Sequence, residues 1–336
     1  MATLASETHT LLDYSRRLNP DGSIETDIVE MLSQSNEILT DMLWMQGNLE
    51  TGHRVTMRTG LPTGTWRKLN QGVASSKSTT AQVDESCGMY FQRGQIDKDL
   101  AMLNGNTAAY RLSENVAHME AMAQELAETI LYGDTDTNPE KMLGLAPRFS
   151  TISGATNGQN ILSGGGAGSD NTSVWLIGWG QKSCYGIFPK GSKAGVEHLV
   201  IKDSTGDGCT EVTDSDGYKY RAFVDQYSQK AGLCLKDWRY VVRIANIDVS
   251  NLVAESSAAD LIKLMSRALD RFPTTAGIKP VFYMNRTVYS MLKIQALAKS
   301  NAALSVEEAL GQFTVKFLGV PIRKVDAILN TEATIS

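Results

Sequence analysis

A long amphipathic helix over residues 106–132 is the feature that most constrains how this chain folds. Apolar residues recur there at steps of four and three, which places them on one face of a helix. Asn106 is suited to cap its start and Gly133 to end it. At 1.5 Å per residue the helix would be roughly 40 Å long, a length more typical of a structural support than of a catalytic scaffold. The residues predicted to share the face are Leu112, Val116, Met119, Ala123, Leu126 and Ile130.

The segment before residue 50 has too few large apolar residues to form a core. Residues 1–25 are polar, with a turn signal at Asn19-Pro20-Asp21-Gly22, and predict an extended arm. A short helix is expected to follow, with Thr26 and Asp27 able to cap it.

Residues 50–95 predict a long two-stranded hairpin. One strand is expected at Val55–Thr59, a short extended run at Trp66–Leu69 and a returning strand at Val83–Arg93. The hairpin has little apolar surface to bury against its own domain, so it needs another domain or a neighbouring subunit to pack on. Its basic residues form either a solvated face or a charged face that meets an acidic neighbour. They are Arg54, Arg58, Arg67, Lys68, Lys77 and Arg93.

The chain after the long helix mixes strands and helices, which indicates an α+β fold. A loop-rich stretch at 134–172 is followed by a β-rich region and then by helices at 257–271 and 285–297. The predicted strands are 173–179, 185–188, 199–202, 218–226, 233–244, 279–283, 313–317 and 322–325.

Composition excludes several classes of protein. The 32 basic and 37 acidic residues give a net charge of −5, so the basic excess typical of proteins that wrap nucleic acid is missing. The four cysteines form no C-x-x-C pair and are interpreted as reduced thiols. We expect no signal peptide and no membrane span, and therefore synthesis in the cytoplasm.

No motif predicts catalysis, a cofactor or a metal. Each histidine stands alone in the sequence, and the glycine-rich run 163–168 lacks the order of a phosphate-binding loop. Residues 203–208 partly match a calcium-binding loop, but Asp214 stands where a glutamate is expected, so a hairpin turn is the preferred interpretation.

Three motifs resemble the major capsid proteins of tailed bacteriophages, which have the HK97-type fold. The stretch from Gly60-Leu61-Pro62 to Trp66-Arg67-Lys68-Leu69-Asn70-Gln71-Gly72 resembles the E-loop of a group of podovirus and siphovirus capsid proteins. Asp97–Asn106 is similar to the segment that leads into the spine helix of that group, and Asn138–Ala146 is similar to the segment after it. The similarity covers nearly the whole chain.

This resemblance implies an order of parts along the chain. Residues 1–49 would be the N-arm and a short helix, 50–95 the E-loop hairpin, and 96–150 the spine helix with the first part of the P-domain. Residues 151–310 would be mainly the A-domain with interleaved P-domain segments, and 311–336 would return to the P-domain.

The resemblance also implies a function without catalysis. Copies of the chain would assemble as pentamers and hexamers into an icosahedral shell around double-stranded DNA, which they would touch weakly and without sequence specificity. A separate scaffolding protein, a portal and a decoration or cement protein are implied partners. The protein would reside in the virion, and in the host cytoplasm during assembly. The E-loop residues expected at the subunit interface are Arg58, Trp66, Arg67, Lys68, Leu69, Lys77 and Arg93.

Some relatives crosslink a hairpin lysine to an asparagine of a neighbour. Lys77 is a conceivable donor, but no acceptor is evident, so we expect non-covalent contacts by the E-loop and N-arm. Two alternatives stay open. One is an encapsulin-like nanocompartment shell, which has the same fold but lacks the phage-like hairpin motifs. The other is an α+β enzyme of unknown class.

Overall fold

The computed structural model describes residues 9, 33–103, 107–214, 216–298, 304–309 and 312–336. These form two compact units. The large unit comprises residues 37–88, 128–194 and 231–336, and the small unit comprises 89–127, 195–230 and the described residues before 37. Apart from His9, the predicted arm at 1–25 lies outside the described residues, as do the helix start at Thr26 and the Asn106 cap.

The core of the large unit is a mixed sheet centred on β5 (Asn171–Trp179). β5 pairs antiparallel with β10 (Val241–Asp248) and with β11 (Lys279–Met284). Every residue of β5 is buried, which is typical of a strand covered on both faces. Beyond β11 the sheet continues through β14 (Val320–Lys324), β13 (Gln312–Phe317) and β12 (Leu304–Ala309).

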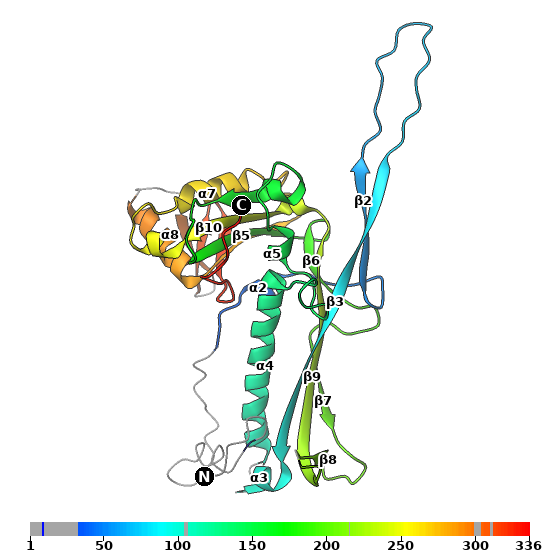
Figure 1. Cartoon of the computed structure of the whole chain (residues 1–336), viewed down its shortest axis with the longest axis vertical. Coiled ribbons are helices and arrows are strands. Elements are labelled where there is room, and N and C mark those ends of the chain that lie inside the picture. The colour runs from blue at the N-terminus through cyan, green and yellow to red at the C-terminus, as the bar shows by residue number, and fades with distance from the viewer. Residues whose placement is uncertain (1–8, 10–32, 104–106, 215, 299–303, 310–311) are drawn as a thin grey trace. The chain divides into compact units, whose positions relative to one another are not determined.

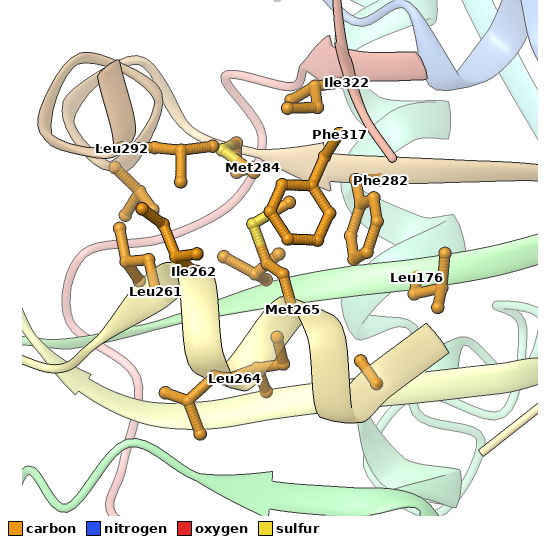
Figure 2. Close-up of a cluster of buried hydrophobic side chains, with 14 of the residues drawn as sticks. Leu176, Leu261, Ile262, Leu264, Met265, Phe282, Met284, Leu292, Phe317 and Ile322 are labelled. Atoms are coloured by element: carbon orange, nitrogen blue, oxygen red, sulfur yellow. The ribbon is translucent and has the colours of Figure 1, made fainter. Parts of the chain in front are cut away.

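Helices α7 (Leu261–Leu269) and α8 (Arg286–Ala298) contribute apolar side chains to the main core of the large unit. Figure 2 shows Met265 of α7 beside Phe282 of β11 and Phe317 of β13. The carboxylate of Asp260 accepts a hydrogen bond from the backbone N–H of Lys263 at 3.2 Å, so α7 starts later than the predicted residue 257.

The long helix is present as α4 (Thr107–Tyr132), and the backbone N–H of Gly133 closes its last turn on the carbonyl of Thr129 at 2.8 Å. The predicted apolar face is wrong over its first half. Leu112, Val116 and Met119 are 65%, 53% and 54% exposed, whereas Ile130 is buried.

The cause of this error is a polar contact. In the small unit, Arg111 of α4 donates to both carboxylate oxygens of the buried Asp225 on β9, at 2.8 and 3.0 Å. His118 lies two turns further along the same face of α4 and stacks on Tyr227 of β9 at 5.5 Å. The helix therefore turns these polar and aromatic groups toward the sheet, and its apolar stripe points elsewhere.

The hairpin is formed by β2 (Gly52–Gly60) and β3 (Thr79–Asp97). β3 is longer than the predicted strand Val83–Arg93. The expected extended run at Trp66–Leu69 is wrong, because residues 61–78 form the loop between the strands, which Figure 1 shows continuing beyond both strand ends.

In the small unit, β9 (Lys219–Leu235) pairs antiparallel with β7 (Val196–Ile201) and β8 (Thr210–Thr213). The predicted strand at 233–244 is two strands, because residues 233–235 end β9 and residues 241–244 begin β10. Asp237 accepts a hydrogen bond from the backbone N–H of Arg239 at 3.1 Å and caps a 3-10 turn at Trp238–Tyr240, which separates β9 from β10. The small core consists of Ile96, Ala101, Tyr110, Cys209 and Phe223.

Short elements complete the described chain. They are α2 (Ile38–Asp41), β1 (Trp44–Gln46), α3 (Lys98–Met102), α5 (Leu145–Arg148), η2 (Thr156–Asn160), β4 (Ile161–Ser163), β6 (Cys184–Phe188), η3 (Trp238–Tyr240) and α6 (Val249–Val253).

The exposure of α4 predicts unequal effects of two truncations on one helix. Ile130→Ala should lower the free energy of unfolding by about 2–5 kcal/mol, because it removes a buried side chain. Leu112→Ala should change it by less than about 0.5 kcal/mol, because that side chain is exposed. Urea unfolding of the unassembled chain, followed by circular dichroism, measures both. Equal losses would contradict the assignment of the faces.

Candidate functional site: the hairpin and its anchor

The loop at the tip of the hairpin displays apolar side chains to solvent. All residues from 61 to 77 are exposed, and Trp66 and Leu69 have relative exposures of 103% and 91%. The hydroxyl of Ser76 donates to the carbonyl of Thr63 at 2.7 Å, which links the two sides of the loop. Apolar side chains gathered on one exposed loop indicate a surface that binds a partner. The other apolar members are Leu61 and Val73.

The same tip is positively charged. Residues 51–83 contain five basic and no acidic side chains. Four of the five, Arg58, Arg67, Lys68 and Lys77, are exposed and have no ion-pair partner among the described residues. The fifth, Arg54, pairs with Asp84 at 2.6 Å, which lowers the pKa of that carboxyl.

The structure thus gathers six of the seven predicted interface residues at one end of the hairpin. Arg58 is on β2, and Trp66, Arg67, Lys68, Leu69 and Lys77 are in the loop. Arg93 lies apart from them, on the portion of β3 that belongs to the small unit.

A buried ion pair anchors the base of the hairpin. Arg148, at the end of α5, donates two parallel hydrogen bonds to the carboxylate of Glu85 on β3, at 2.7 and 2.6 Å. Both side chains are about nine-tenths buried. The guanidinium also donates to the backbone carbonyls of Gly144, Leu143 and Leu233, at 3.1–3.3 Å. All three guanidinium nitrogens thus have acceptors, which makes a buried charge tolerable.

This pair was not predicted from the sequence. Its members are 63 positions apart, and nothing in the local pattern of either residue marks it as buried. The only available signal was Glu85 itself, a charge within a stretch predicted to be strand.

Apolar contacts support the same anchor. Val55 of β2 packs with Tyr185, Ile187 and Cys234 of the neighbouring strands, and Cys87 lies against this cluster. Burial raises the pKa of the Cys87 thiol to about 11. All four cysteines of the chain are free. Between residues 52 and 88, the buried residues are Gly52, Val55 and Glu85, so the hairpin is held at its base alone.

Residues 203–208, which partly match a calcium-binding loop, form ion pairs with basic side chains of the same chain. Asp207 accepts from Lys98 at 2.9 Å and from Arg221 at 2.8 Å, and Arg221 also pairs with Asp203 at 3.0 Å. These contacts, led by Lys98, hold the pKa of Asp207 far below its ordinary value. The segment forms the loop between β7 and β8, which both pair with β9, so it is a connection between two successive partners of β9 and the hairpin turn expected from the sequence is wrong.

The glycine-rich run and the isolated histidines noted in the sequence have defined surroundings in the structure. The glycine-rich run borders a cavity of about 350 Å³ that Asp248 and Asn251 also line. Two histidines that stand alone in the sequence, His118 and His198, both stack on Tyr227 in the small unit. Within the described ranges no group of three or more acidic, histidine or cysteine side chains could hold a metal, and no helix is long and apolar enough to cross a membrane.

Comparison with known proteins identifies the family of the chain. The family of the major capsid protein GP7 matches residues 19–336. The chain belongs to this family. The protein is therefore a phage major capsid protein, a shell-forming subunit of the virion.

Solved structures support this assignment. The chain is similar to a protein in the near-atomic structure of bacteriophage Epsilon15, with 34% identity and a TM-score of 0.76 over 100% of this chain and 99% of that one. The capsid of bacteriophage JBD30 is 8% identical with a TM-score of 0.51, over 91% of this chain and 95% of that one, and it shares the fold. No curated protein matches.

The encapsulin alternative has less support. The SrpI encapsulin of Synechococcus elongatus is 7% identical, with a TM-score of 0.38 over 62% of this chain and 86% of that one, which is too dissimilar to support a shared function. The α+β fold expected from the sequence, of the HK97-like capsid type, is confirmed.

Removing the Glu85 carboxylate should destabilise this capsid protein strongly. Glu85→Ala leaves the Arg148 guanidinium buried without its counter-charge, which typically costs about 3–5 kcal/mol. Asp84→Ala is the matched control, because Asp84 is next to Glu85 in the sequence but forms an exposed ion pair with Arg54. This variant should leave the urea midpoint unchanged. Similar midpoints for both variants would show that the buried pair is not the anchor.

Proposed function

We propose that the hairpin tip is the surface through which each subunit holds its neighbour in the shell. The observation that carries this proposal is the complete exposure of Trp66, with Leu69 also exposed beside unpaired arginine and lysine side chains. Tryptophan and arginine are enriched among the few interface residues that contribute most of the binding free energy. The interface residues are those predicted from the sequence, with Arg93 contributing from a separate part of β3.

We further propose that the contacts are non-covalent and individually weak. Closed rings of five and six subunits multiply such contacts, because each subunit is held by several neighbours at once. The N-arm would add a second contact of this kind. Lys77, which is exposed in the tip loop, would contribute its charge to the contact rather than a covalent bond.

The other expected roles belong to the same proposal. The shell would enclose double-stranded DNA, and the net charge of −5 favours weak contact with it. A scaffolding protein, a portal and a decoration protein would act with the subunit, and assembly would occur in the host cytoplasm. The subunit would perform these roles without catalysis.

Truncating the tip should block assembly without unfolding the subunit. Trp66→Ala combined with Leu69→Ala removes two exposed side chains, so the far-ultraviolet circular dichroism should stay unchanged. The yield of closed particles, counted by electron microscopy and sedimentation, should fall by more than about tenfold. Leu199→Ala, which truncates an exposed leucine of β7, is the control and should assemble normally. Undiminished particle yield from the tip variant would refute the proposed interface.

Boiling mature particles in denaturant tests the non-covalent proposal. A single band at the subunit mass on a denaturing gel is the expected result, because hydrophobic and ionic contacts dissociate under these conditions. A ladder of bands at multiples of the subunit mass would show covalent crosslinks and overturn this part.

A further inference from the structure

Unpaired charges of opposite sign occupy two separate segments of the large unit. The hairpin tip holds Arg58, Arg67, Lys68 and Lys77. The segment 128–140, from the end of α4 into the loop after it, contains four acidic residues and no basic one. Glu128, Asp136 and Glu140 are exposed and have no ion-pair partner among the described residues. We call residues 128–141 the acidic loop. It contains four carboxylates and, at its end, one basic side chain, that of Lys141.

The acidic loop is ordered by its own hydrogen bonds. Asp134 accepts from the backbone N–H of Asp136 at 3.0 Å and from the hydroxyl of Thr137 at 2.8 Å. The backbone N–H of Gly144 donates to the carbonyl of Gly133 at 2.7 Å and closes the loop. A Cβ at Gly144 would lie only 2.7 Å from the carbonyl oxygen of Thr129, so glycine is required for this closure. A preorganised surface loses little conformational entropy when a partner binds.

A cavity of about 330 Å³ lies within the acidic loop. Its lining combines the carboxylates of Glu128 and Asp134 with the Tyr132 side chain and with Gly133, the glycine that follows α4. The size suits one large side chain rather than an extended ligand. The lining residues are Glu128, Thr129, Tyr132, Gly133, Asp134, Thr137, Asn138 and Lys141.

The acidic loop also lies at the opposite end of the hairpin from the tip. A Cβ at Gly88 of β3 would be 3.1 Å from the carbonyl oxygen of Glu140 and from the backbone nitrogen of Met142. The loop is thus packed against the base of the hairpin. β2 alone extends about 27 Å from there toward the tip, so the tip of a hairpin is remote from the acidic loop of its own subunit.

We propose that the acidic loop receives the hairpin tip of a second copy of this chain. Trp66 of one subunit enters the cavity of the next, and Arg67 and Lys68 face Glu128, Asp136 and Glu140. Charge complementarity selects this occupant, because the tip combines an exposed indole with basic side chains. The acidic loop combines exposed carboxylates with a cavity that the Tyr132 side chain helps to line. The inference rests on the proposed function of the tip and adds the surface that binds it.

Such a contact joins two different surfaces, the tip of one hairpin and the base of the next. A head-to-tail contact of this kind generates a closed ring when the rotations from each subunit to the next add up to one full turn. Rings of five and six copies would then differ only in a small adjustment at one repeated contact.

Charge reversal in both surfaces tests the pairing. Arg67→Glu with Lys68→Glu, and separately Asp136→Lys with Glu140→Lys, should each lower particle yield by more than about tenfold. The chain carrying all four substitutions should regain at least half of the particle yield of the unmodified chain, because each reversed tip again meets an oppositely charged loop. Glu197→Lys with Asp216→Lys, which reverses two exposed acids elsewhere, is the control and should assemble normally.

A crosslink gives an independent measurement. Particles of the Thr65→Cys, Asn138→Cys chain, which keeps Trp66 and Thr137 and changes two exposed neighbours, should yield reducible ladders of up to five or six subunits after oxidation with a mild disulfide catalyst, as expected for rings. Each single-cysteine variant is the control and should give no ladder. Loss of assembly on tip reversal, with normal assembly on loop reversal and no ladder, would overturn the acidic loop as receptor and leave the proposed function standing. Normal assembly of both reversed chains would overturn the proposed function as well.

Discussion

The ion pair between Arg148 and Glu85 is the contact on which the display of the hairpin depends. Few residues of the hairpin are buried, and this pair is a side-chain link between β3 and α5 of the large unit, in addition to the backbone pairing of β3 with β9. A buried pair of this kind adds little net stability compared with an apolar contact, but it tolerates almost no change in geometry. It therefore fixes the direction in which the hairpin leaves the domain more than it increases the stability of that domain.

Polar contacts set orientation elsewhere in the protein too. Arg111 and Asp225 help to set which face of α4 meets the sheet in the small unit, and the apolar side chains Leu112, Val116 and Met119 in the first half of the helix are exposed. In the large unit, Glu332 near the end of the chain accepts from the buried Arg243 at 2.8 Å. Apolar burial supplies the driving force for both cores, and directional charged hydrogen bonds select one arrangement among several of similar packing.

A shell subunit has to remain folded and soluble before assembly and yet bind neighbours afterwards. In the proposed function the hairpin tip would meet both demands, because its exposed apolar side chains are interleaved with arginine and lysine. Like charges on identical tips repel one another and discourage tip-to-tip association. An acidic receptor at the base of the next hairpin would turn the same charges into attraction, so one charge pattern would disfavour the wrong contact and favour the right one.

Local pattern in the sequence was sufficient to predict most elements of this protein. The long helix, the strands around 173–179 and 279–283 and the helix at 285–297 were all correctly predicted, because each has a strong period or a clear boundary residue. The exposed Trp66 and the basic hairpin could also be predicted, since a segment without apolar partners of its own has to display them. Only the tertiary structure decided which face of α4 is buried, that Glu85 meets Arg148, and that an acidic cavity lies at the base of the hairpin. These depend on pairing between residues far apart in the chain, and the energies of such pairings come from burial and geometry that no local pattern records.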